Sequence, residues 1–338
     1  MNAALNRRDV LWRLVAALVA GTTSRQVAAQ NTAAGKVSPG MRVLLLGTQG
    51  GPNFNTQRAE TASLVIIGNQ LHLVDCGYGA LAALIRADRN YRDVAHVFLT
   101  HLHDDHTADL ASLMGHQWTG GRVTPTDIYG PDGTRRLVEG SLQFNRMSEE
   151  IRLVDEARSA RMADLFHAHE IKATSTPTVA FRDATLAVSA VENTHYPVES
   201  LRRMRHRALS LRFDGPGRSV VFSGDTAYSE NLVKLAHGAD VLLCEALHIP
   251  STRAAFDVRV AAGAYADNPE GVWKHIVAAH TPLDVAGRMA REAGVRTLVL
   301  NHLIPGGWNP EIGDEVYRRE AAREFGGEII VGRDLMEI

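Results

Sequence analysis

The stretch His101-Leu102-His103-Asp104-Asp105-His106 follows the apolar run Val97–Thr100 and precedes a helix-like segment that starts at Thr107. In an extended chain, residues 101 and 103 project to the same side, so two imidazoles can converge on one cation. As the chain turns into the helix, Asp105 and His106 point elsewhere and can serve a second cation a few ångström away. The alternative is that the aspartates cap a helix and the histidines are exposed. Three histidines and an acid at this spacing favour a metal site.

Short apolar runs that close on Gly or Asp surround this stretch, and segments with helical spacing lie between them. The strands come in hairpin-like groups and also alternate with helices, which favours an α+β fold of two packed sheets with helices outside. The composition, with 45% hydrophobic and 22% charged residues, excludes collagenous, coiled-coil and wholly disordered chains. Strands are predicted at 41–47, 63–68, 71–75, 94–100, 126–129, 185–191, 208–213, 219–222, 241–245, 297–301 and 328–331, and helices at 81–86, 108–114, 134–142, 231–237, 282–293 and 314–325.

Three later segments carry similar residue types, namely Asn193-Thr194-His195, Ser223-Gly224-Asp225-Thr226 and Asn301-His302-Leu303. Together with the His-x-His-x-Asp-His pattern, they resemble the metal motifs of the metallo-β-lactamase superfamily in order and approximate spacing. The resemblance covers about residues 41–338 and implies a four-layer αββα sandwich in a single domain. Within the superfamily the chain is most similar to ribonuclease Z and to exported arylsulfatase-like hydrolases, through Gly47–Pro52, Val74–Gly77 and Tyr129–Gly133.

The resemblance implies a ligand set for two zinc ions. Asp225 would bridge both ions from a Gly-containing turn, where a carboxylate can offset the repulsion between two cations. Taken alone, Asp225 could equally be an Asx-turn acid, and His302 a partly buried strand-end histidine. Manganese or iron could also occupy such a His/Asp site. One zinc would be bound by His101, His103 and His195, and the second by Asp105, His106 and His302.

A further pair resembles catalytic residues of the ribonuclease Z branch. His280 precedes a helix, and Glu245 matches the acid that orients this histidine. A histidine held by a carboxylate can donate a proton to a departing oxygen. The alternative is an incidental histidine beside a helix-capping Thr281. The family also implies a catalytic role for Asp105, which would steady a hydroxide generated between the two ions. The expected reaction is therefore hydrolysis.

Four arginines follow His195 in a loop-like segment and could clamp a sulfate or phosphate ester near the metals, because guanidinium binds such anions in a bidentate manner. A solvated charged turn is the alternative. The arylsulfatase-like relatives share a His-x-Pro-Val pattern, which here is His195–Val198. We therefore expect a small-molecule ester as substrate, most of all an aryl sulfate or a phosphoester. The arginines are Arg202, Arg203, Arg205 and Arg207.

Ribonuclease Z holds transfer RNA with a Gly/Pro/Lys-rich arm, and the corresponding interval here, residues 145–171, contains no such arm and is typical of one amphipathic helix. Nucleic acid is therefore not expected as a partner. Three alternatives to a sulfate or phosphate esterase stay open: a lactonase or β-lactamase-type hydrolase, a ribonuclease Z-type phosphodiesterase, and a non-catalytic metal-binding protein. A purely binding site would need no open position between two ions.

Residues 1–29 have the features of a cleaved export signal. Arg7-Arg8 precedes a weakly apolar stretch, and Val27-Ala28-Ala29 is a small-residue cleavage site. The pair resembles a twin-arginine signal, which implies a periplasmic or secreted protein. Because the segment carries four Arg and one Asp, its removal takes the formal net charge from −2 to −5. The apolar stretch is too short to span a bilayer, so no integral membrane segment is expected, and residues 30–40 are predicted to be a linker.

Cys76 and Cys244 both end apolar runs and are interpreted as buried free thiols, although an exported chain leaves a disulfide open. A homodimer is also open, because relatives are often dimers.

Overall fold

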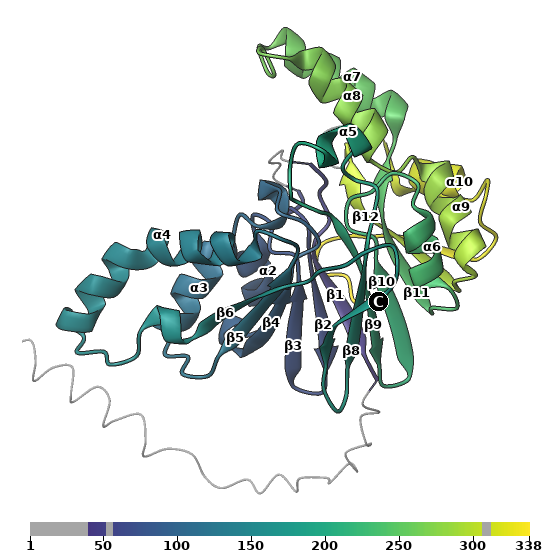
Figure 1. Ribbon diagram of the computed structural model, residues 1–338. Helices are drawn as coiled ribbons and strands as arrows, with labels where there is room; N and C mark the ends of the chain where they lie inside the picture. Colours follow the sequence, from purple (N-terminus) through teal and green to yellow (C-terminus); the bar gives the residue numbers. More distant parts are fainter. Residues whose placement is uncertain (1–39, 52–56, 306–311) are drawn as a thin grey trace, which may run out of the picture. The chain divides into compact units, whose positions relative to one another are not determined.

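The computed structural model describes residues 40–51, 57–305 and 312–338, and these group into one compact unit. Figure 1 shows two β-sheets packed together with helices on their outer sides. The predicted export signal and all of the predicted linker except Gly40 lie outside the described residues. Among the described residues, no helix is both long enough and apolar enough to cross a membrane.

The first sheet has six strands in chain order, from β1 at one edge to β6 at the other. β1, β2 and β3 pair antiparallel, whereas β3, β4, β5 and β6 run parallel. Parallel neighbours need crossover connections, and helices supply them here. The strands are β1 (Arg42–Gly47), β2 (Ala62–Ile67), β3 (Gln70–Val74), β4 (Val94–Phe98), β5 (Thr126–Gly130) and β6 (Phe166–Glu170).

The second sheet has seven strands, in the order β13-β12-β11-β10-β9-β8-β7. β7 to β10 form an antiparallel meander, and β10 to β13 are parallel. Both sheets are therefore mixed, with antiparallel hairpins beside parallel crossover units. The strands are β7 (Thr178–Arg182), β8 (Ala187–Glu192), β9 (Leu209–Gly215), β10 (Arg218–Phe222), β11 (Val241–Leu247), β12 (Thr297–Ile304) and β13 (Glu328–Val331).

Six of the described helices cover the outer faces of the two sheets. On the first sheet lie α2 (Ala80–Arg86), α3 (Leu110–Thr119) and α4 (Thr134–Asp155), and on the second α6 (Glu230–Ala236), α9 (Leu283–Ala293) and α10 (Asp314–Ala321). The short helix α5 (Val198–Leu201) follows β8, and α7 (Ile249–Ala261) and α8 (Pro269–Ala279) pack on each other beyond the layers (Figure 1). Three short 3-10 helices complete the described elements: η1 (Tyr91–Asp93), η2 (Asp104–His106) and η3 (Met162–Asp164).

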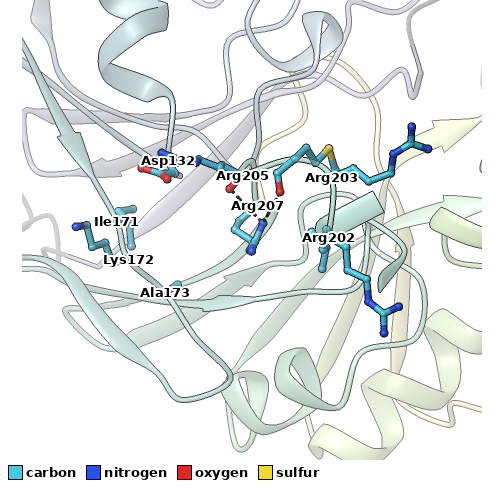
Figure 2. Close-up of a pocket in the computed structure, with 10 residues that line it drawn as sticks. Asp132, Ile171, Lys172, Ala173, Arg202, Arg203, Arg205 and Arg207 are labelled. Carbon is cyan, nitrogen blue, oxygen red and sulfur yellow. Dashed lines mark hydrogen bonds between the residues drawn. The ribbon is translucent and has the colours of Figure 1, made fainter. Parts of the chain in front are cut away.

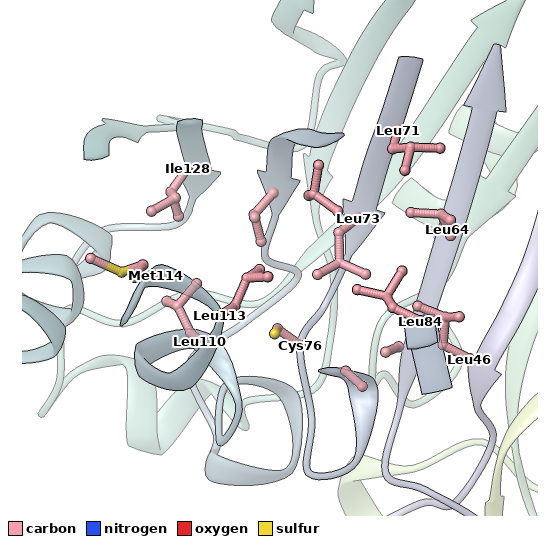
Figure 3. Close-up of a cluster of buried hydrophobic side chains, with 14 of the residues drawn as sticks. Leu46, Leu64, Leu71, Leu73, Cys76, Leu84, Leu110, Leu113, Met114 and Ile128 are labelled. Carbon is pink, nitrogen blue, oxygen red and sulfur yellow. The ribbon is translucent and has the colours of Figure 1, made fainter. Parts of the chain in front are cut away.

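Three hydrophobic cores separate the four layers. In β1, Leu44 and Leu46 pack toward the helices of the first sheet, while Val43 and Leu45 pack toward the second sheet. Successive strand residues point to opposite faces, and burial on both faces explains why such strands are continuous apolar runs. Figure 3 shows the core between the first sheet and its helices. These layers confirm the predicted αββα sandwich and α+β class.

Three parts of the predicted secondary structure were wrong. The segments 134–142 and 145–171 do not hold two helices, because α4 runs through Gly140 and its exposed end carries the i,i+4 ion pair Arg146–Glu150. β6 and β7 were both missed. Each is an edge strand, polar residues occupy the exposed positions of β6, and no residue of β7 is fully buried. No helix was predicted for the short α5, or for α7 and α8, which lie outside the layered core.

The two cysteines are free, as predicted. Both are buried, Cys76 in the core under the first sheet and Cys244 in the core under the second, so the structure holds them in different layers.

Candidate metal centre

The candidate ligands follow strands whose carboxyl ends meet at one edge of the sandwich. His101 comes after β4, His195 after β8 and Asp225 after β10. His302 lies near the carboxyl end of β12. Since β8, β10 and β12 run in the same direction within the second sheet, their carboxyl ends share an edge, and the contact between His103 and His195 brings the end of β4 to it. Ligand sites of sheet proteins commonly form at such edges.

Three histidines converge in a first group. His103 Nδ1 lies 3.0 Å from His101 Nε2 and 3.3 Å from His195 Nε2. His195 donates its other nitrogen, Nδ1, to the carbonyl of Ala279 at 3.1 Å, which leaves Nε2 facing the group. Burial lowers the pKa of both His101 and His195 well below the usual range, so both rings are neutral, which is the form that binds metal. The structure therefore brings this predicted trio together.

A second group collects His106, His302, Asp105 and Asp225, all buried. His302 Nε2 lies 3.2 Å from a carboxylate oxygen of Asp105 and 3.2 Å from Asp225 Oδ1. His106 Nε2 lies 3.2 Å from the same Asp225 oxygen. Burial opposes protonation of His106 and His302, but the carboxylates around them, of which Asp225 contributes most, together outweigh it and raise the pKa of both rings.

Asp225 stands between the two groups. Its Oδ1 faces His106 and His302, while its Oδ2 lies 3.9 Å from His101 Nε2. The preceding Gly224 has φ +58°, and a Cβ there would lie 2.6 Å from the carbonyl oxygen of Leu209. The turn thus requires glycine, and it presents one carboxylate to both groups, as expected of a bridging ligand.

A β-bulge delivers His302 to the site. In the pairing of β11 with β12, Glu245 opposes Asn301 but Ala246 opposes Leu303, so His302 is the extra residue. Its φ of +43° is a strained conformation for a residue other than glycine. Bulges re-aim a side chain in this way, and backbone strain of this kind concentrates at functional sites.

Asp75 is a site residue to which the sequence interpretation gave no role. It follows β3, accepts a hydrogen bond from the Thr100 backbone N–H at 2.8 Å, and receives one from His106 Nδ1 at 2.9 Å. This contact fixes the ring of His106 so that Nε2 faces Asp225. The signal available in the sequence was its position directly after a buried strand, in the segment Val74–Gly77.

The residues fit a pair of metal ions. Ligand atoms about 2.1 Å from a tetrahedral ion lie roughly 3.4 Å apart, and the distances within both groups are close to this value. His106 Nε2, Asp225 Oδ1 and His302 Nδ1 are buried and have no hydrogen-bond partner among the described residues. Unsatisfied buried polar atoms are costly, and bound cations would satisfy those that face the groups. Neutral imidazole and carboxylate are preferred zinc ligands.

The predicted catalytic pair is in contact. His280 follows α8 and donates Nδ1 to a carboxylate oxygen of Glu245 at 2.7 Å, while Glu245 also accepts from the Thr226 N–H at 2.5 Å. Burial opposes the charge on His280, but Glu245 together with Asp225 and Asp105 outweighs it and raises the pKa of His280 to about 9. The same Glu245 and His280, together with Asp225 and His302, could also hold an ion. Cations bound nearby would oppose protonation of His280.

A cavity of about 270 Å³ opens above these groups. Its polar end is formed by His103, Asp105, Asp225 and His280, and its walls by α7, α8 and their connection. No Lys or Arg is among the described residues that line it. None of the cavity wall was predicted from the sequence. It includes His275, whose pKa burial lowers to about 4.

The four arginines do not line this cavity. They lie with Asp132 and Lys172 around a separate basic pocket beside α5. In Figure 2 the side chains of Arg202 and Arg203 point away from Lys172, and Arg207 forms an ion pair with Glu192 at 3.1 Å. The four arginines therefore do not form the expected clamp next to the metal site, because they line a different pocket.

Comparison with known proteins identifies the family. The β-lactamase superfamily domain matches residues 72–303. The ribonuclease Z of Mycobacterium bovis (strain BCG / Pasteur 1173P2) is 32% identical over 304 residues, and that of Mycobacterium avium (strain 104) is 31% identical over 310. Each match covers 88% of this chain and 98% of the relative.

Solved structures agree on the fold. The metallo-β-lactamase fold protein YhfI from Bacillus subtilis superposes with a TM-score of 0.60 at 22% identity, and the short form of human tRNase Z with 0.60 at 19% identity. Each comparison covers 88% of this chain and 98% of the other. The chain belongs to the metallo-β-lactamase superfamily, in which it is a ribonuclease Z-like, metal-dependent hydrolase.

Proposed function

We propose that the protein hydrolyses phosphodiesters with two divalent cations held by the seven candidate ligands. Relatives that are 30% or more identical over nearly their whole length are named ribonuclease Z, which favours a phosphodiester over the aryl sulfate expected from the sequence. The aryl sulfate reading has no support among these relatives. The His-rich donor set favours zinc.

The ligands would divide between the ions according to the two groups. His101, His103 and His195 would hold one cation, and Asp105, His106 and His302 the other, with Asp225 between them. When bound, such a pair supplies Lewis acidity to a phosphoryl oxygen and lowers the pKa of water to about 7. Asp105 also lines the cavity, where its carboxylate can accept a proton from the attacking water.

The contact between His280 and Glu245 is the observation that carries the proposal. A site that only binds metal has no use for a proton donor, yet His280 is held 2.7 Å from Glu245 and lines the same cavity as the ligands. Because Nδ1 is occupied by Glu245, the other ring nitrogen is left to protonate the departing oxygen. General acid catalysis of this kind contributes about 10²- to 10⁴-fold in rate.

The test compares two phosphodiesters that differ in their leaving group. With an alkoxide leaving group, which must be protonated, we expect His280→Ala to lower kcat by about 10²- to 10⁴-fold. With p-nitrophenoxide, which departs as a stable anion, the loss is expected to be much smaller. Metal content, measured by elemental analysis, should stay at two ions in this variant.

Parallel assays decide between reaction classes. Hydrolysis of aryl sulfate, lactone or β-lactam reporters by the zinc-loaded protein, without phosphodiester hydrolysis, would refute the proposal. An equal loss with both leaving groups would remove His280 from the role of proton donor.

RNA is a second candidate substrate. The names of the relatives favour it, and the basic pocket formed by Lys172 and the arginines beside α5 offers cations to a phosphate backbone. Export through residues 1–29 would separate the enzyme from transfer RNA, and this part of the proposal rests on sequence alone.

A further inference from the structure

The cavity above the candidate metal centre has a polar end and an apolar wall. The wall consists of Phe256 on α7, Tyr265 in the connection, and Val272 and Ile276 on α8, with Ile304 on the opposite side. Figure 1 shows that α7 and α8 extend beyond the four layers. The helical pair therefore adds to the sandwich a surface that the layered core does not need.

Aromatic contacts hold the side chains of this wall against one another. The ring of Phe256 stacks on that of Tyr265 with centroids 5.3 Å apart and an angle of 9° between the rings, and it lies 5.4 Å from the ring of Trp273. The guanidinium of Arg253 covers Trp273 at 4.9 Å from the outside. A wall fixed before a ligand arrives loses little side-chain entropy on binding.

The cavity and its charge limit what can enter. A volume of about 270 Å³ lies near the lower end of small-molecule sites and accommodates a ring and a phosphate group. A polynucleotide binds largely through cations that neutralise its phosphates, and the described lining contains no Lys or Arg. The cations are instead in the separate pocket beside α5.

We propose that the α7–α8 wall binds an apolar aromatic ester group of a small phosphodiester, so that the enzyme selects such esters over polynucleotides. This inference rests on the proposed phosphodiesterase function and names its substrate class. The phosphoryl group lies at the polar end beside Asp225 and His280, and the ring lies against Ile276 and Val272.

Two phosphonates test the wall without any reaction step. Phenylphosphonate and methylphosphonate carry the same headgroup and differ only in the group that would meet the wall. By calorimetry with the zinc-loaded protein, we expect phenylphosphonate to bind roughly 10- to 100-fold more tightly, the gain given by burial of one ring. Equal dissociation constants would overturn the inference.

Variants of α8 locate the effect. Val272→Trp fills the cavity and should reduce the phenyl-to-methyl preference to about one, and Ile276→Ala should lower it several-fold. Val277→Ala is the matched control, because Val277 is on the same helix, is 38% exposed and does not line the cavity. Circular dichroism shows whether each variant is folded. A preference that persists in Val272→Trp would place the ring elsewhere and refute the inference.

The experiments distinguish a failure of the wall proposal from a failure of the proposed phosphodiesterase function. Phosphodiester hydrolysis with equal binding of both phosphonates leaves the function standing and removes the wall as its specificity site. A ten-nucleotide RNA that binds more tightly than phenylphosphonate, weakens with salt and is unaffected by Val272→Trp would also overturn the inference in favour of a polynucleotide substrate.

Discussion

The second ligand group and a pair of histidines between the sheets have opposite electrostatics. In the second group, Asp225 and the neighbouring carboxylates together raise the pKa of His106 and His302 against the effect of burial. Between the sheets, His72 and His96 place their Nδ1 atoms 3.0 Å apart and stack with ring centroids at 5.0 Å, and burial lowers the pKa of both. Among the described residues, no carboxylate forms an ion pair with His72 or His96. Carboxylate partners, rather than burial, distinguish the second ligand group from the His72–His96 pair.

The largest expected effect comes from neutralising the central carboxylate. Asp225→Asn removes the charge shared by both ligand groups, so we expect hydrolysis to fall by roughly 10³-fold or more and bound metal to drop below two ions per chain. The matched control is Asp127→Asn on β5, which removes a carboxylate that contacts His169 at 2.7 Å, outside the candidate metal centre. Elemental analysis and steady-state kinetics measure both variants. Equal damage from Asp127→Asn would end the distinction between the two regions.

A smaller effect is expected from the residue that orients His106. Asp75 has φ +58°, a conformation that Asn also tolerates, so Asp75→Asn should change the hydrogen bond to His106 and leave the backbone as it is. Loss of such an orienting carboxylate costs about 10- to 100-fold in metal affinity or activity. Competition with a chromogenic chelator measures the affinity. Unchanged zinc affinity would mean that Asp75 serves only the backbone of Thr100.

The seven candidate ligands were not equally accessible to sequence reasoning. The contiguous stretch from His101 to His106 predicts ligands by local spacing alone, because a strand end followed by a turn fixes where each side chain points. His195, Asp225 and His302 are separated along the chain, and only the family resemblance joined them. Their proximity depends on the order of strands within one sheet and on a bulge in β12. The local pattern of apolar residues predicts neither of these.

Other parts of the site could not be predicted from one sequence. The role of Asp75 depends on β3 lying next to β4, which brings it to Thr100 and His106. The apolar residues of α7 and α8 have the character of core residues, and only the placement of these helices beyond the layers turns them into a cavity wall. The arginines after α5 illustrate the reverse error, since proximity to His195 in sequence did not place them in the cavity.

The smallest expected effect tests the other histidine cluster through stability. The unfolded chain protonates His72 near pH 6.5, whereas burial lowers the pKa of His72 in the folded protein to about 4. Between these values the unfolded state binds more protons, so the free energy of unfolding falls as the pH is lowered from about 6.5 to about 4.

His72→Asn, whose amide can replace Nδ1 in the contact with His96, should remove about 1–3 kcal/mol of this acid-induced loss. Urea unfolding at several pH values, with chelator present for both proteins so that the metal centre contributes equally, measures the difference. Parallel pH profiles for the two proteins would show that the His72–His96 pair resists protonation no more than an exposed histidine does. The pair would then no longer contrast with the second ligand group.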